Sequence, residues 1–187
     1  FPNIFGELFV AGTLCVGVAI RLEANLAFVG LGESGRSDTS EQHDQVLDEA
    51  LRDAQRAMSY LRQHAEEYGI DAGRIGVIGF SAGAHLATNL AVNYKTRDRT
   101  DATDDYSSRP DFWVSVYGGF GWSEIPNGTP PAFLVHAAND SKVPVQGSID
   151  LFSALKKKGI PAELHIYEHG EHGFALETNR GEAVTST

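Results

Sequence analysis

Apolar residues along this chain fall into two kinds of pattern. Short and nearly continuous apolar runs predict strands that are covered on both faces. Longer stretches, in which apolar residues recur every three or four positions, predict helices with one buried face. The predicted strands are residues 26–30, 75–80, 112–117, 132–136 and 162–167, and the predicted helices are residues 47–65, 82–92 and 146–158.

Strands and helices alternate along the chain. This order predicts a mainly parallel sheet with helices packed against it, an α/β three-layer sandwich. Residues 1–187 are expected to form a single domain, because a chain of 187 residues is long enough to bury one core. A further apolar run at residues 8–20 predicts a buried helix ahead of the first strand.

Charge and composition narrow the class of protein. The net charge of −10 disfavours nucleic acid and anionic membranes as partners. The single cysteine, Cys15, excludes an internal disulfide and a multi-cysteine zinc site. The apolar run at residues 8–20 is too short to cross a bilayer, and no Lys or Arg precedes it as in a signal peptide. We expect a soluble protein, cytoplasmic or secreted, without a metal or other cofactor.

The most informative motif is Gly79-Phe80-Ser81-Ala82-Gly83, a G-x-S-x-G pentapeptide between a predicted strand and a predicted helix. This context is typical of a nucleophile elbow, a sharp turn that exposes a serine hydroxyl above the sheet. Side chains two positions from the serine on either side would collide in such a turn, so both positions require glycine. We therefore predict that Ser81 is a nucleophile.

A serine nucleophile needs a base to accept its proton and a carboxylate to orient that base. When such a triad is built on an α/β sheet of this kind, the order along the chain is serine, acid, histidine. Asp140 follows the strand at residues 132–136 and is the predicted acid. The alternative is an aspartate that caps or turns into the following helix.

Two histidines, His169 and His172, follow the last predicted strand. His172 lies deeper in the loop and is better placed to reach both Ser81 and Asp140, so we predict it as the base. His169 stays an alternative. The segment around them is also compatible with a solvated polar loop or with a metal site made of carboxylates and imidazoles. The remaining histidines are expected to have structural roles: His43, His64, His85, His136 and His165.

Four motifs in register resemble the acetyl-xylan-esterase-like and related esterase and lipase proteins of the α/β-hydrolase superfamily. They lie at residues 79–87, 108–112, 136–144 and 161–174, and the resemblance covers about residues 47–176. It implies a catalytic triad of Ser81, Asp140 and His172, with the backbone N–H of Ala82 as an oxyanion donor. It also implies a serine carboxylesterase that hydrolyses short acyl esters, among them acetylated carbohydrates.

The chain departs from this family near its beginning. Family members carry a glycine-rich loop that completes the oxyanion hole, and the corresponding segment here is Pro2-Asn3-Ile4-Phe5-Gly6. Asn3 and Ile4 are the residues expected to supply the second donor. The strands that would precede this loop are missing as well. We therefore expect an N-terminally shortened sheet with an open edge, where a second copy of the chain could bind.

This departure leaves two alternative functions open. One oxyanion donor is worth about 10²–10³ in rate, so a weakly active or non-catalytic scaffold is one alternative. The other is a serine peptidase of the prolyl-oligopeptidase kind, which shares the order of the triad. The expected substrate of an esterase is a small-molecule ester. Six aromatic residues are candidates for its acyl or alcohol pocket, although each could instead belong to the core: Phe5, Trp113, Tyr117, Phe120, Trp122 and Phe174.

Overall fold

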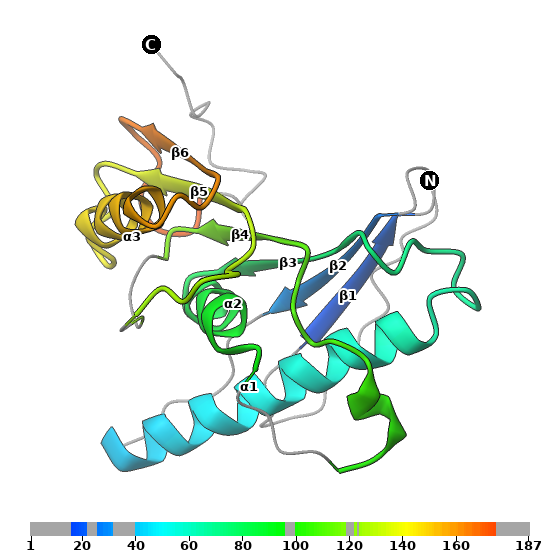
Figure 1. Ribbon diagram of the computed structural model, residues 1–187. Helices are drawn as coiled ribbons and strands as arrows, with labels where there is room; N and C mark the ends of the chain where they lie inside the picture. The colour runs from blue at the N-terminus through cyan, green and yellow to red at the C-terminus, as the bar shows by residue number, and fades with distance from the viewer. Residues whose placement is uncertain are drawn as a thin grey trace.

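The computed structural model describes residues 16–21, 26–31, 40–95, 100–118, 122 and 124–174, and it describes side chains from residue 48 onward. The described strands form one sheet in chain order (Figure 1). The strands are β1 (Val16–Arg21), β2 (Leu26–Leu31), β3 (Ile75–Phe80), β4 (Phe112–Val116), β5 (Ala132–Ala137) and β6 (Ala162–Tyr167). The helices are α1 (Ser40–Gln63), α2 (Ala82–Asn93), the short 3-10 helix η2 (Ala102–Asp105) and α3 (Gln146–Lys157).

The pairing of the strands confirms a mainly parallel sheet. β1 runs antiparallel to β2, and the strands from β2 to β6 run parallel to one another. β3 and β6 occupy the predicted ranges, and β2, β4, β5, α2 and α3 differ from them by one residue at one end. The hydrophobic period therefore located these elements well, because each strand or helix has one face that must be covered.

The prediction for the N-terminal apolar run was wrong where the structure describes it. Residues 16–20, expected in a helix, belong to β1. An apolar run of this length does not distinguish a strand from a buried helix, and its Val and Ile residues favour a strand once β2 is available as a partner. A strand therefore precedes β2 where a helix was expected, and β1 is the edge strand on that side of the described sheet. Residues 8–15 lie outside the described residues.

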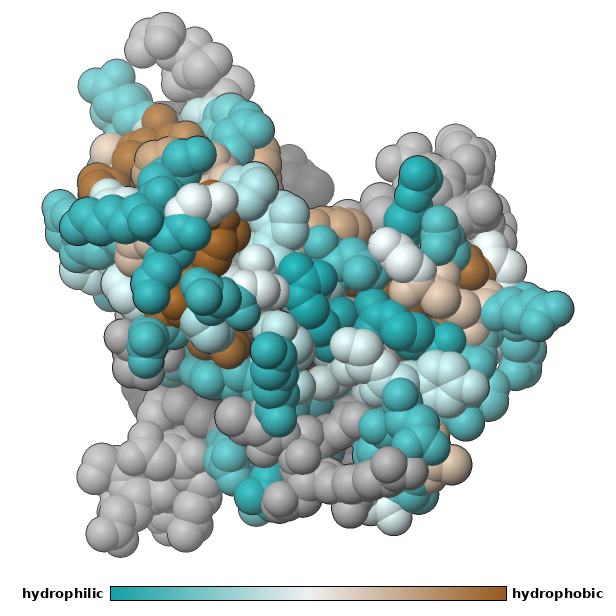
Figure 2. All heavy atoms as spheres, viewed as in Figure 1, coloured by the Kyte–Doolittle hydropathy of each residue, from teal (hydrophilic) through white to brown (hydrophobic). Residues whose placement is uncertain are grey.

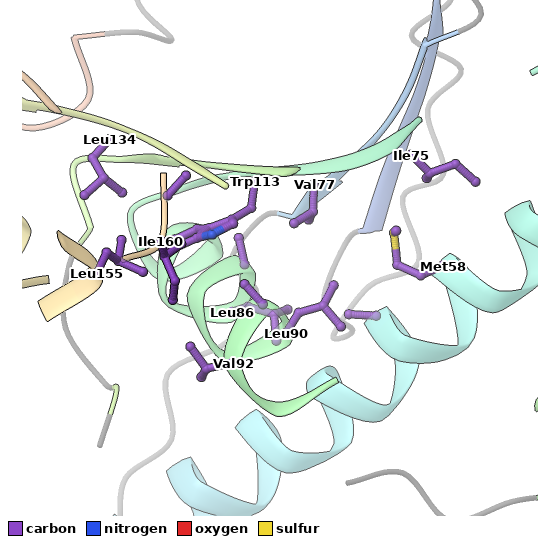
Figure 3. Close-up of a cluster of buried hydrophobic side chains, with 14 of the residues drawn as sticks. Met58, Ile75, Val77, Leu86, Leu90, Val92, Trp113, Leu134, Leu155 and Ile160 are labelled. Atoms are coloured by element: carbon purple, nitrogen blue, oxygen red, sulfur yellow. The ribbon is translucent and has the colours of Figure 1, made fainter. Parts of the chain in front are cut away.

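Helices α1, α2 and α3 pack on the same face of the sheet. Crossovers between parallel strands are right-handed as a rule, and the strand order never reverses, so successive helices reach the same face. Figure 3 shows the resulting core, in which Trp113 and Leu134 of the sheet face Leu86, Leu90 and other side chains of the helices. The described residues thus account for the sheet and one helical layer of the expected sandwich.

The topology also determines where a site can form. Parallel strands end at one edge of the sheet, and loops at the carboxyl ends of such strands are the usual place for binding and catalysis. α2 begins directly after β3, and the segments 138–145 and 168–174 follow β5 and β6. The sheet therefore brings Ser81, Asp140 and His172 to the same edge, although up to 91 positions separate them along the chain.

The surface shows no membrane-spanning element in the described part of the chain. None of the described helices is both long and apolar enough to cross a bilayer. Figure 2 shows a mostly hydrophilic face, with hydrophobic residues concentrated where α3, β5 and β6 lie. Phe133 on β5 and Ile166 on the edge strand β6 are exposed. Assembly through a sheet edge stays a prediction.

Candidate active site

Ser81 lies in the sharp turn between β3 and α2. Its φ of 55° and ψ of −119° are values that residues other than glycine rarely adopt, so the surrounding structure must hold them in place. The Ser81 N–H donates to the Val116 carbonyl at 3.0 Å, and the Ser81 carbonyl accepts from the Ala84 N–H at 2.9 Å. A Cβ added at Gly79 would collide with the Gly83 carbonyl. The turn therefore has the close approach that the pentapeptide predicts.

Ser81, His172 and Asp140 form one hydrogen-bonded chain. The Ser81 Oγ lies 2.8 Å from His172 Nε2, and His172 Nδ1 lies 2.8 Å from Asp140 Oδ2. When Nδ1 of a neutral imidazole donates to the carboxylate, Nε2 is left to accept the serine proton. The Asp140 side chain is fully buried, and 13% of the His172 side chain is exposed. This arrangement can transfer a proton from the serine while keeping the carboxylate away from water.

Hydrogen bonds keep Asp140 ionised despite its burial. Burial by itself raises the pKa of the Asp140 carboxyl, but donation from the Val143 N–H, from His172 and from the Lys142 N–H outweighs it, and the pKa lies below its usual range. The two backbone groups reach Oδ1 at 2.8 Å and 2.9 Å. Oδ2 accepts from His172, and His136 Nε2 lies 3.2 Å away from the same oxygen.

A set of hydrogen bonds joins the loop of the acid to the loop of the histidine, and we name it the loop clasp (Asn139, Ser141, Gly170 and Glu171). Asn139 Oδ1 accepts from the N–H groups of Gly170 and Glu171, each at 3.0 Å. The Glu171 carboxylate accepts from Ser141 Oγ at 3.1 Å and from Asn139 Nδ2 at 3.4 Å. Glu171 has a φ of 54°, and this left-handed residue turns the chain directly before His172. The clasp therefore sets the position of the histidine loop.

An aromatic ring supports the imidazole of His172. Tyr117, directly after β4, is 1% exposed, and its ring centroid lies 4.9 Å from that of His172. Tyr117 has a φ of 43°, and its N–H donates to the Val135 carbonyl at 2.7 Å. Phe174 packs edge-on against Tyr117 at 5.3 Å. These rings limit the directions in which the His172 ring can turn.

The alternatives for the histidine loop have different surroundings. The His169 side chain is 67% exposed, and its Nε2 lies 3.7 Å from Glu168 Oε1. The structure brings His172, and not His169, to Ser81 and Asp140. Within the described ranges, no three His, Cys, Asp or Glu side chains gather in a way that could hold a metal ion.

The other predicted site residues have varied positions. Ala82 is the first residue of α2. The backbone N–H at this position has no acceptor within the helix and lies at the positive end of the helix dipole. Trp122 is half-buried and packs against the hydrophobic core, and Phe174 packs against Tyr117 and Tyr167 beside His172. The predicted oxyanion donors Asn3 and Ile4 and the predicted pocket residues Phe5 and Phe120 lie outside the described residues.

Sequence reasoning did not assign a site role to His136 or Asn139. His136 was expected to be structural, yet its ring contacts the carboxylate of Asp140. Asn139 directly precedes Asp140, and asparagine in a turn often binds nearby backbone groups, which is a weak signal for its part in the clasp. The distant backbone groups that it binds follow β6, and no local pattern indicates such a contact.

A mainly parallel sheet with a nucleophile elbow after one strand, and with an acid and a histidine after later ones, defines an α/β-hydrolase. The comparisons agree with this class. The model of the prolyl oligopeptidase family matches residues 93–187, half of the chain, and the chain belongs to this family. A second family model, BD-FAE, matches residues 40–124.

Curated relatives include two proteins from bacteria. The endo-1,4-beta-xylanase B of Butyrivibrio fibrisolvens is 28% identical over 67% of this chain and 24% of its own length. The acetylxylan esterase of Xylanibacter ruminicola is 27% identical over 67% of this chain and 31% of its own length. The chain thus spans less than a third of the length of either relative.

Solved structures show the same fold. The acetyl ester-xyloside bifunctional hydrolase of Caldicellulosiruptor lactoaceticus is 36% identical, with a TM-score of 0.61 over 67% of this chain and 57% of its own. The Est2 esterase of Thermogutta terrifontis is 26% identical, with a TM-score of 0.62 over 70% of this chain and 56% of its own. Together with the strand order, these likenesses place the chain in the α/β-hydrolase fold.

Proposed function

We propose that this protein is a serine carboxylesterase that hydrolyses short acyl esters, acetyl esters above all, with Ser81, His172 and Asp140 as its catalytic triad. The observation that carries the proposal is the continuous hydrogen-bonded chain from Ser81 Oγ through His172 to Asp140, with both contacts at 2.8 Å. The names of the relatives, an acetylxylan esterase among them, support ester bonds of acetylated carbohydrate as substrates.

The reaction has two halves. Ser81 Oγ attacks the ester carbonyl while its proton passes to His172 Nε2, and the ionised Asp140 stabilises the imidazolium that forms. Collapse of the tetrahedral intermediate breaks the bond to the alcohol, which leaves with the proton from His172. Water then attacks the acyl-enzyme by the same route and releases the carboxylic acid and Ser81.

The negative oxygen of each tetrahedral intermediate needs donors that are already in place. The Ala82 N–H at the start of α2 is the proposed first donor, because it directly follows the nucleophile at the positive end of the helix. The backbone around Asn3 and Ile4 is the proposed source of the second donor. A missing second donor would slow the reaction by about 10²–10³.

The test is a series of p-nitrophenyl esters from acetate to octanoate, measured beside acetylated xylan with the unmodified protein and with Ser81→Ala. We expect the highest kcat/KM for acetate and a loss of about 10⁶-fold in kcat for Ser81→Ala, as in other serine hydrolases with a triad. Turnover no higher than in Ser81→Ala would contradict the proposal and favour the non-catalytic scaffold. A maximum at octanoate would contradict the preference for acetyl esters.

Membership of the prolyl oligopeptidase family favours one second candidate, a serine peptidase with the same triad. The two candidates differ in the bond that is broken, because an amide needs its leaving nitrogen protonated and its peptide chain held in an extended site. A proline-containing peptide p-nitroanilide distinguishes them. Cleavage of this amide at a rate close to that of the acetate ester would favour the peptidase.

A further inference from the structure

A second histidine, His136, lies against the acid of the proposed triad. It is the penultimate residue of β5, it faces the helical layer, and it is fully buried. Its Nε2 lies 3.2 Å from Asp140 Oδ2 and 3.0 Å from the Val143 carbonyl. Its Nδ1 lies 2.8 Å from the buried Ser148 Oγ in the first turn of α3. The ring therefore links β5, the turn that holds the acid, and α3.

Counting the hydrogens around this ring fixes which nitrogen carries one. A carbonyl oxygen and an ionised carboxylate only accept, so Nε2 of His136, which faces both Val143 and Asp140, must donate. The Ser148 hydroxyl has one hydrogen and two neighbours, His136 Nδ1 and the Gly118 carbonyl at 2.9 Å. Whichever neighbour receives it, the hydrogen on Nε2 remains.

We infer that His136 is a positioning residue for the triad acid, whose Nε2–H holds the same Asp140 oxygen that His172 uses. The inference rests on the proposed function. The Nε2–H is shared between Asp140 Oδ2 and the Val143 carbonyl, and the same Oδ2 also faces His172 Nδ1 at 2.8 Å. His136 does not itself exchange a proton with the substrate. It determines where the carboxylate lies, and thereby the orientation of His172 toward Ser81.

Two substitutions separate this role from simple packing. The amide nitrogen of His136→Gln lies roughly where Nε2 does, whereas that of the shorter His136→Asn lies roughly where Nδ1 does. We expect His136→Gln to keep kcat within about 5-fold. We expect His136→Asn to lose about 10- to 100-fold in kcat, as for a lost hydrogen bond to a charged group, with little change in KM. Ser148→Ala leaves the Nε2–H in place and is expected to have the smaller effect.

The pH dependence gives a readout that packing alone would not change. Without the donor on Nε2, more of the negative charge of Asp140 acts on His172 and favours its protonated form. The acid limb of the kcat/KM profile should therefore move to higher pH in His136→Asn and stay in place in His136→Gln. Among the residues that the structure describes, the other ionisable groups that face or adjoin His172 are Tyr117, against its ring, and Glu171, its neighbour in the chain.

A measurement on the unmodified protein covers the case in which His136→Asn does not fold. In the ¹⁵N-labelled unmodified protein, NMR should show a proton on His136 Nε2, assigned by its loss in His136→Gln. An Nε2 without a proton would overturn the inference. Equal kcat losses in His136→Gln and His136→Asn would also overturn it, if these losses follow the folded fraction and the pH profiles stay unchanged. An Nε2 proton in a protein without Ser81-dependent esterase activity would overturn the proposed function and, with it, any positioning role in catalysis.

Discussion

Asp104 lies in the 3-10 helix η2, within the loop between α2 and β4, and Asp140 lies in the loop after β5; each accepts hydrogen bonds from the chain around it. Their side chains are 2% and 0% exposed. Asp104 Oδ2 accepts from the N–H and the hydroxyl of Thr100 at 2.6 Å and 2.9 Å, while its Oδ1 lies 3.2 Å from Arg56. Asp140 has imidazoles in the place of the guanidinium. In both loops backbone groups donate to the carboxylate, and the loops differ in the side chain that donates to it, a guanidinium in one and imidazoles in the other.

This difference decides what each loop can do. A guanidinium stays protonated at any physiological pH, so the Arg56 contact can only hold the loop on α1. An imidazole gains and loses a proton near neutral pH, so the Asp140 loop can take part in proton transfer. Their places in the fold differ as well, because the Asp104 loop precedes β4 and the Asp140 loop follows β5. Only the second lies at the carboxyl ends of the strands.

The largest expected effect comes from replacing the side chain that donates to each carboxylate, His172 for Asp140 and Arg56 for Asp104. His172→Gln should lower kcat for p-nitrophenyl acetate by about 10⁶-fold, because the serine then has no base. Arg56→Gln should leave kcat within about 2-fold, because it removes a contact near the surface far from the site. His169→Gln, with a side chain that is 67% exposed, serves as the matched histidine control. If His169→Gln lost most of its kcat while His172→Gln stayed active, His169 and not His172 would be the base.

Replacing each carboxylate by an amide tests whether the two aspartates differ in function. Asp140→Asn should lower kcat by about 10⁴-fold, since the amide no longer stabilises the imidazolium and favours the wrong tautomer of the histidine. Asp104→Asn should lower the melting temperature and leave the kcat of the folded protein almost unchanged. Steady-state kinetics and thermal unfolding on the same samples check both. Equal kcat losses in the two variants would show that Asp140, like Asp104, only supports its loop.

Local patterns predicted the strands, and they indicated the three side chains that the structure brings together after β3, β5 and β6, because both depend on regularities visible in the chain. The strand before Ser81, the two glycines around it and the order of Asp140 and His172 are all visible in the chain. The same patterns failed for Val16–Arg21, where the choice between helix and strand depends on pairing with β2. The site contacts of His136 and Asn139 were not predicted, because their partners depend on how β5, β6 and α3 pack together, and no local sequence pattern indicates that packing.

The loop clasp gives a smaller expected effect within the Asp140 loop. Asn139→Ala removes the acceptor of two N–H groups that position the histidine loop, and kcat should fall by about 10-fold, in line with one or two lost hydrogen bonds. Ser141→Ala removes one hydroxyl contact to Glu171 and should cost less. Both variants keep Ser81, His172 and Asp140, so any loss in kcat reports on the position of these residues. A change in KM without a change in kcat would contradict a positioning role for the clasp.

The smallest expected effect concerns acid unfolding near the Asp104 loop. Hydrogen bonds, first from Arg56 and then from the Thr103 N–H, lower the pKa of Asp101, three positions before Asp104, to about 2. A carboxyl whose pKa is lower in the folded state stabilises that state above the pKa of the unfolded chain, near 4, and this contribution disappears as the pH falls through about 2. The melting temperatures of the unmodified protein and Arg56→Gln should therefore differ slightly at pH 6 and converge toward pH 2. The difference stays small because 38% of the Arg56 side chain and 52% of the Asp101 side chain are exposed, so water screens the pair. A gap that widened on acidification would show that Arg56 acts on stability through something other than the ionised carboxylates.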